Sequence, residues 1–261
     1  NTLAAGVQSF QTTGAYYQTR LVTSFGLGIH YFNYGQNDQT DAAGNLIGRF
    51  HAADYVVQAM VSRSYLQRWH YWVTLKWLQS SYGIYRASAL AMDAGVTYTD
   101  SLQGWRIGLV ASNMGSILSN YATESTNGDL PFDLRIGLSR KLPKAPIQLS
   151  LTLHHLHRFN LTYDDTSSTR LQQSSKSLPE TIFRHVVIGT QIFITDRIEF
   201  SAGYNYLRRK ELNIANGANG LNGFSMGVGV LFKRLQFRYA RTYYQSRNSI
   251  HQVGLSLQFS S

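Results

Sequence analysis

Three histidines in a short run, His154, His155 and His157, have the types and spacing best suited to chemistry. Imidazole nitrogens bind transition metals and exchange protons near neutral pH. Side chains two positions apart share one face of a β-strand, so His155 and His157 could chelate one ion. The sequence fixes no acidic or further histidine partner beside them, and the chain contains no cysteine. We therefore expect neither a metal site nor a cofactor.

Nucleophilic catalysis of the serine type needs a serine, a histidine and an acid in one place. Serines and aspartates are spread over polar segments of this chain, so no such set can be assigned. Asp164 and Asp165 are adjacent carboxylates in a segment rich in Ser and Thr, where we expect water to solvate them. We expect no catalytic residue and a protein that is not an enzyme.

Charged residues of both signs interrupt the apolar runs, at positions of the opposite parity to the apolar residues. On the polar face of a strand they can pair with one another, which is the simpler interpretation, or line a path for solutes. The residues are Lys76, Asp93, Arg106, Asp133, Arg135, Glu199 and Arg238.

The elements that position these residues are clearest between Leu130 and Asp165. From Leu130 to Leu138 every even position is apolar, and the odd positions carry polar, charged, glycine or proline residues. A basic turn with two prolines follows, and the alternation resumes from Ile147 to Tyr163. A period of two is that of a β-strand with two different faces. Because the polar face is wet, the segment suits a membrane barrel better than a soluble sandwich with a dry inner face.

The same period recurs along the whole chain, and helical periodicity is absent. We expect about fourteen strands, the first two at about residues 3–10 and 15–21. The polar connections at about residues 34–52, 118–129, 164–179 and 211–222 are long, and most connections between them are short. Outer-membrane barrels alternate in this way, with long loops outside the cell and tight turns in the periplasm. The predicted fold is an all-β, transmembrane antiparallel β-barrel, with residues 1–261 as a single outer-membrane domain.

The long connections supply the candidate residues for binding a partner, because they are long and polar and the chain shows no catalytic constellation. The candidates are Asn37, Asp38, Asp41, Asn45, Asn127, Asp129, Asp164, Asp165, Asn216 and Asn219.

Composition is consistent with this interpretation. The chain has 261 residues and 43% hydrophobic content, with no run long enough for a transmembrane helix. Its 17 Tyr and 13 Phe suit aromatic girdles at the two membrane surfaces. The net charge of +10 suits the phosphates of lipopolysaccharide and anionic lipids. The basic residues form no arm or cluster in the sequence, which argues against nucleic acid.

The chain begins at Asn1 inside an expected strand and shows no export signal. We therefore expect a signal peptide and a plug-like segment to precede these residues in the full protein.

Several segments resemble the PorQ/PorV family of type IX secretion system proteins from Bacteroidetes, whose members have a barrel like that of the fatty acid transporter FadL. The clearest segment is LPFDLRIGLSRKLPKAPIQLSLTLHHLHRFNLTYDD, from Leu130 to Asp165. Others are FGLGIHYFNYG (Phe25–Gly35), the polar segment Asp41–Gly48, and ALAMDAGVTYTD (Ala89–Asp100). The resemblance covers most of the chain in order and is thinner towards its end.

The resemblance implies an integral outer-membrane part of a cell-surface attachment complex. Such a protein would anchor a PorZ-like surface partner, together with PorV and the sortase-like PorU, while cargo is attached to anionic lipopolysaccharide. It implies no catalytic residue. The alternative left open is a FadL-like outer-membrane pore for hydrophobic or small solutes, which the polar, glycine-rich face would suit.

Overall fold

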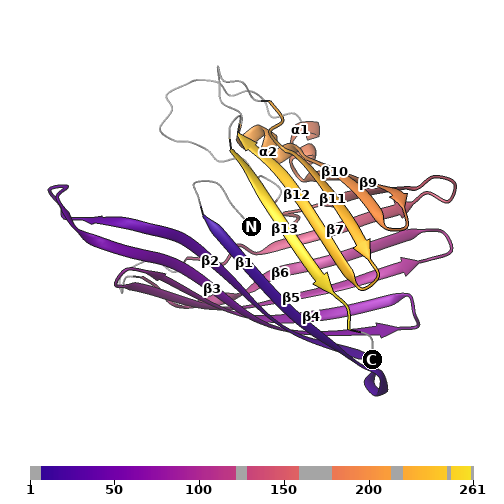
Figure 1. The fold of residues 1–261 in the computed structure, drawn as a ribbon, viewed down its shortest axis with the longest axis horizontal. Helices are drawn as coiled ribbons and strands as arrows, with labels where there is room; N and C mark the ends of the chain where they lie inside the picture. The colour runs from indigo at the N-terminus through magenta and orange to yellow at the C-terminus, as the bar shows by residue number, and fades with distance from the viewer. Residues whose placement is uncertain (1–6, 122–127, 159–177, 213–219, 246–247, 260–261) are drawn as a thin grey trace. The chain divides into compact units, whose positions relative to one another are not determined.

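The computed structural model describes residues 7–121, 128–158, 178–212, 220–245 and 248–259. It is an all-β structure, a sheet of 13 strands in which the strand order follows the chain. The chain divides into two compact units, coloured along the chain in Figure 1.

The first unit contains six strands and comprises residues 1–100, 108–132 and 250–252. Its strands β2 and β3 are the longest and run side by side over most of their length (Figure 1). The strands are β1 (Gln8–Gln18), β2 (Thr23–Thr40), β3 (Leu46–Tyr65), β4 (Trp69–Tyr82), β5 (Tyr85–Asp100) and β6 (Trp105–Ser119), with a 3-10 turn at Thr19–Leu21.

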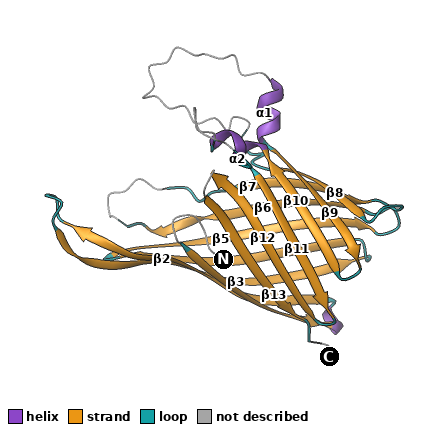
Figure 2. Cartoon of the chain, turned by 45° about the horizontal axis from the view of Figure 1, so that its top comes forward, coloured by secondary structure: helices purple, strands orange, loops and turns teal. Residues whose placement is uncertain are grey.

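The second unit contains the remaining strands and two short helices, and comprises residues 101–107, 133–249 and 253–261. The helices contact each other, and α2 contacts β9; both lie beyond the ends of β9 and β10 (Figure 2). The elements are β7 (Asp133–Lys141), β8 (Ile147–Leu153), α1 (Leu178–Arg184), β9 (Val186–Thr195), β10 (Ile198–Asn205), α2 (Tyr206–Glu211), β11 (Phe224–Phe232), β12 (Leu235–Gln245) and β13 (Asn248–Leu257).

Burial is inverted relative to a water-soluble sheet. On β4, Trp69, Val73 and Leu75 are exposed, with Leu75 at 51%, whereas Thr74 between them is 6% exposed. Along β3, exposed apolar residues likewise alternate with covered residues, and along β11 Met226 and Val228 are exposed whereas Gly227 and Gly229 are buried. Among the described residues, the buried apolar side chains are alanines and one leucine: Ala52, Ala53, Ala89, Ala91 and Leu207. Large apolar side chains thus lie on the outer face of the strands, where a soluble protein would place polar ones.

Glycines on the covered face make room for side chains of neighbouring strands. A Cβ at Gly95 would lie 2.6 Å from the ring of Trp72, which lies over the strand there. At Gly229 the group that fills the space is the carboxylate of Glu199. At these two positions a side chain from a neighbouring strand occupies the space above the glycine.

The described residues form thirteen strands where about fourteen were expected, and the difference lies at the start of the chain. The segment Gln11–Gly14, which we interpreted as a link between two strands, is part of β1. Thr12 pairs with Ile29 and Gly14 with Leu27 in an unbroken register. Threonine is a good strand former, so nothing at this point ends the strand.

Two short helices, α1 and α2, occupy parts of segments that the sequence predicts as loops and strands. In α1, Glu180 lies in the first turn and Arg184 in the last, the arrangement that the helix dipole favours. In α2, the Asn205 side chain accepts a hydrogen bond from the backbone N–H of Arg208 at 3.0 Å and caps the helix. Both helices are too short for a period of 3.6 to be recognised. Neither is long and apolar enough to cross a membrane, as far as the described residues go.

Candidate functional site

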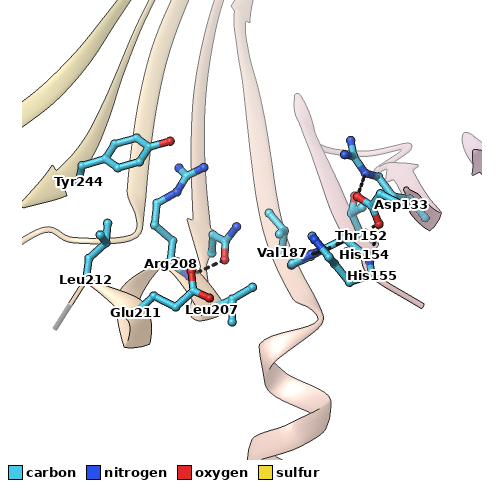
Figure 3. Close-up of a pocket in the computed structure, with 12 residues that line it drawn as sticks. Asp133, Thr152, His154, His155, Val187, Leu207, Arg208, Glu211, Leu212 and Tyr244 are labelled. Carbon is cyan, nitrogen blue, oxygen red and sulfur yellow. Dashed lines mark hydrogen bonds and ion pairs between the residues drawn. The ribbon is translucent and has the colours of Figure 1, made fainter. Parts of the chain in front are cut away.

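A pocket of about 520 Å³ lies in the second unit, where strand ends meet α2 (Figure 3). This volume is in the usual range for small-molecule sites, about 300–1,000 Å³. In Figure 3, Asp133, His154 and His155 lie on one side and Leu207, Arg208 and Tyr244 on the other. The lining residues are Asp133, Arg135, Thr152, His154, His155, Val187, Asn205, Leu207, Arg208, Glu211, Leu212 and Tyr244.

Asp133 fixes one wall of the pocket. Its carboxylate is buried at the start of β7. One oxygen accepts a hydrogen bond from the backbone N–H of His155 at 2.6 Å, and the other accepts from Nε of Arg135. The Nδ1 atom of His155 is 3.8 Å from the same carboxylate. Because donors surround it, Asp133 serves to hold the turn after β8 rather than to act as a free base.

His154 is the most enclosed of the histidines in the pocket wall, at 7% exposed. Its backbone N–H donates to the carbonyl of His185 at 3.0 Å, and Nδ1 of His185 donates to the carbonyl of His154 at 2.7 Å. The Nδ1 atoms of His154 and His155 share a hydrogen bond, so one of the two rings carries the proton. Burial first, and then the neighbouring His155, lower the pKa of His154 to about 4. His154 is therefore neutral at pH 7.

The opposite wall is built by α2 and β12. The guanidinium of Arg208 lies over the ring of Tyr244, 4.6 Å from its centroid, in a cation–π contact. The next residue, Arg209, donates to the carbonyls of Gly220 and Asn222 at 3.1 and 3.4 Å. The side chain of Asn222 donates to the carbonyl of Leu212 at 3.2 Å. These bonds hold α2 against the segment that leads into β11.

His155 and His157, which the sequence suggested as a chelating pair on one face of a strand, do not lie on a strand. β8 ends at Leu153, and His155 has a φ of 56°, which turns the backbone. The rings of His155 and His157 are 6.0 Å apart and stacked. In the described ranges, no group of three or more His, Cys, Asp or Glu side chains could hold a metal ion. The lining of the pocket includes the cationic side chains of Arg135 and Arg208 and the imidazoles of His154 and His155.

Six of the seven charged residues predicted on the polar face form ion pairs. Lys76 Nζ is 2.6 Å from Asp93 Oδ1, and both also bond Asn113. Arg238 Nε is 3.2 Å from Glu199 Oε1. Asp133 and Arg135 pair at the pocket, whereas Arg106 is exposed near a turn. Lys76 and Asp93 belong to the first unit and the others to the second, so the seven residues form no single site.

The candidate loop residues are in several settings. Asn37 and Asp38 lie within β2, because β2 and β3 continue to pair beyond the expected loop start; Asp38 bonds Arg49 at 3.1 Å. Asp41 and Asn45 form the turn at the end of this hairpin. Donation from the side chain and backbone of Asn45 lowers the pKa of Asp41. Asp129 is exposed. The other candidates, Asn127, Asp164, Asp165, Asn216 and Asn219, lie outside the described residues.

The sequence interpretation missed Arg208 and Tyr244, which line the pocket, and His185, which hydrogen-bonds to the backbone of His154. Arg208 could have been found from Asn205, an N-cap residue that follows a strand. No sequence signal relates Tyr244 to Arg208, since their contact depends on the pairing of distant strands.

Comparison with known proteins adds little. No family model matches the chain, and no curated protein matches it. A solved structure of a mutant porin from Rh. blastica aligns with 97% of this chain and 90% of its own, at 8% identity and a TM-score of 0.37. A score of this size is too low to assign a fold or a function.

Proposed function

We propose that this chain is an integral β-barrel of a bacterial outer membrane. The observation that carries the proposal is the inverted burial of β4: Leu75 is half-exposed, and Thr74 beside it is buried. Exposed Trp, Val and Leu side chains are stable in the hydrocarbon of a membrane. The strands of a transmembrane barrel alternate apolar residues that face the lipid with polar residues that face the interior. Closing the sheet would also remove its unpaired edges, which lipid cannot satisfy.

We further propose that a surface partner docks at the strand ends that the long polar connections join. The β2–β3 hairpin extends to a turn at Asp41–Asn45, with the acidic Asp38 and Asp41 exposed on it. The candidate partner is a PorZ-like surface protein of a type IX attachment complex, with PorV and PorU beside it, working on lipopolysaccharide. The sequence resemblance supports this partner. The carboxylates of Asp93, Asp133 and Glu199 are ion-paired with Lys76, Arg135 and Arg238, which is consistent with an anchor rather than an enzyme.

A pull-down from outer membranes tests the docking role. One variant shortens the hairpin by joining Gln36 to His51, which are paired in the register, through an Asn-Gly turn. A control variant replaces residues 142–146, a short connection, with a turn of the same type. We expect the shortened hairpin to lose most of the partner and the control to retain it. Equal recovery from both variants would end the docking role of the hairpin.

The pocket beside Arg208 favours a second function, that of a pore or binding protein for small solutes. Its volume and its mixture of guanidinium, imidazole and carboxylate groups suit a polar or anionic solute. Conductance measurements in planar bilayers decide this point. A steady conductance that falls when Arg208 is replaced by Gln would support a solute path, and a silent barrel would contradict it.

A further inference from the structure

The short connections of the second unit form one continuous edge. Each of them is bonded through its backbone to a neighbouring strand or turn, so the turns lie side by side. The bonds run from Lys141 N to Gly104 O (2.9 Å), Phe193 N to Pro146 O (2.7 Å), Leu231 N to Arg197 O (2.7 Å) and Gln258 N to Arg234 O (2.9 Å). This edge lies at the ends of the strands opposite to α1 and α2.

Exposed cations follow this edge. We call them the basic rim: Arg140, Lys144, Arg197, Lys233 and Arg234. Two acidic residues lie at these turns: Asp196, in the same turn as Arg197, and Asp100, which ends β5 directly before the turn at residues 101–104. In the part of the chain that the structure describes, no ion pair involves a member of the rim. The rim therefore carries a large uncompensated positive charge.

The opposite ends of the same strands show a different arrangement. There Arg184 and Lys210 both bond Glu180 at 3.3 Å. Arg135 bonds Asp133. These three cations have acidic partners within the protein, whereas Arg208 and Arg241 at the same ends lie over the rings of Tyr244 and Tyr243. Among the described residues the rim has no such ion-paired acidic partner, and its charge calls for anions from outside the chain.

The rim also adjoins the apolar face of the strands. The guanidinium of Arg140 lies over the ring of Trp105, 4.6 Å from its centroid. Phe232, 61% exposed, directly precedes Lys233. Cations beside aromatic residues at the edge of an apolar surface are typical of the headgroup layer of a membrane.

We propose that the basic rim binds the phosphate groups of anionic phospholipids. The inference rests on the proposed function, because headgroups lie at this level only if the sheet is embedded in a membrane. An acidic protein is the competing occupant. The cations are distributed along the edge of the apolar face, turn after turn, instead of forming one compact patch, and this distribution fits a layer of headgroups better than a single protein surface.

Fluorescence quenching by brominated lipids tests the proposal at one point of the rim. The full chain is prepared with Trp105 as its single tryptophan, through Trp69→Phe, Trp72→Phe and Trp77→Phe, and is inserted into vesicles. Quenching is compared between brominated phosphatidylglycerol and brominated phosphatidylcholine. We expect a several-fold preference for phosphatidylglycerol that decreases in high salt. Neutralising Arg140 and Lys144 with Gln should remove most of this preference, because each cation near the surface is worth about fivefold in affinity for an anionic lipid.

The control variant removes two cations at the other ends of the strands, through Lys210→Gln and Arg241→Gln, and should keep the preference. If the Arg140→Gln, Lys144→Gln variant does not fold, the salt dependence of quenching in the protein with the intact rim tests the same point. The preference for phosphatidylglycerol should then decrease as the salt concentration rises. Equal quenching by the two lipids would overturn the lipid proposal while leaving the membrane location intact. Absence of quenching by either lipid would instead overturn the proposed function.

Discussion

Arg238 on β12 donates from Nε to Glu199 on β10 at 3.2 Å, although β11 lies between the two strands. Gly229 of β11 is paired with both residues in the register. A Cβ at this position would lie 2.6 Å from Glu199 Oε1. The two charges therefore meet because the residue between them has no side chain.

The first prediction concerns this glycine. Gly229→Ala should push the Glu199 carboxylate aside and uncouple it from Arg238. A double-mutant cycle with Glu199→Gln and Arg238→Gln, read from unfolding in vesicles, should give about 0.5 kcal/mol of coupling in the parent, since Arg238 is largely exposed. In the Gly229→Ala background the coupling should vanish. Gly137→Ala, where a Cβ has 3.8 Å to the nearest atom, should preserve it; equal coupling in all backgrounds would refute this account.

A second glycine is constrained by backbone. A Cβ at Gly115 on β6 would lie 2.0 Å from the carbonyl oxygen of Leu90 and 2.7 Å from Cα of Ala91. Neither atom can rotate away, so Gly115→Ala should reduce the free energy of unfolding by about 3 kcal/mol. Gly108→Ala on the same strand meets its nearest atom at 3.6 Å and should change the free energy by less than about 0.5 kcal/mol. Equal effects of the two substitutions would disprove the close approach.

His154 predicts a dependence of stability on pH. Its pKa is lowered from 6.5 to about 4 in the folded protein, so the unfolded chain takes up a proton first as the pH falls. His154 should therefore reduce the free energy of unfolding progressively between pH 6.5 and about pH 4, by up to about 3 kcal/mol. Denaturation at several pH values should show a shallower dependence in His154→Gln. His51→Gln, at an exposed position, is the control, and an unchanged slope in His154→Gln would contradict the burial argument.

Glu180 links the two helices. Hydrogen bonds from Lys210 and Arg184 lower its pKa, and the bond to Glu180 raises the pKa of Lys210. Glu180→Gln should loosen α1 from α2 and speed hydrogen exchange in residues 178–184, without a change in the strands. Because the pKa of Glu180 is lowered in the folded protein, its stabilising contribution is present above the usual pKa of a glutamate and is lost as the pH falls. Glu211→Gln on α2 is the matched control. If residues 178–184 exchange at the same rate in the Glu180→Gln and Glu211→Gln variants, Glu180 does not link the helices.

The strands were largely predictable because a period of two is a local property. β7 begins at Asp133, within the segment from Leu130 to Leu138 where the alternation predicts a strand. β8 was predicted too long, since the alternation continues in the sequence past Leu153, where the backbone turns at His155. The alternation of apolar and polar positions predicts that Glu199 and Arg238 both lie on the polar face of the sheet. It does not predict that they contact each other, because their contact depends on the register of three strands.

The pocket was beyond the reach of sequence reasoning for the same reason. Asn205 caps a helix of six residues, too short to show a helical period. Arg208 meets Tyr244 only after β11 and β12 pair. Contacts between residues distant in the sequence are set by tertiary packing, and no pattern in a single segment encodes them.

The most direct test of a membrane-embedded sheet compares two apolar, exposed residues. Leu75 is 51% exposed on the face of β4, and Ile84 is 83% exposed in the turn before β5. The free energy of unfolding is measured in vesicles for Leu75→Arg and for Ile84→Arg. If lipid covers the face of β4, Leu75→Arg should cost about 2–4 kcal/mol and Ile84→Arg less than about 0.5 kcal/mol. If water covers that face, the two substitutions will be equally harmless, and the membrane account is wrong.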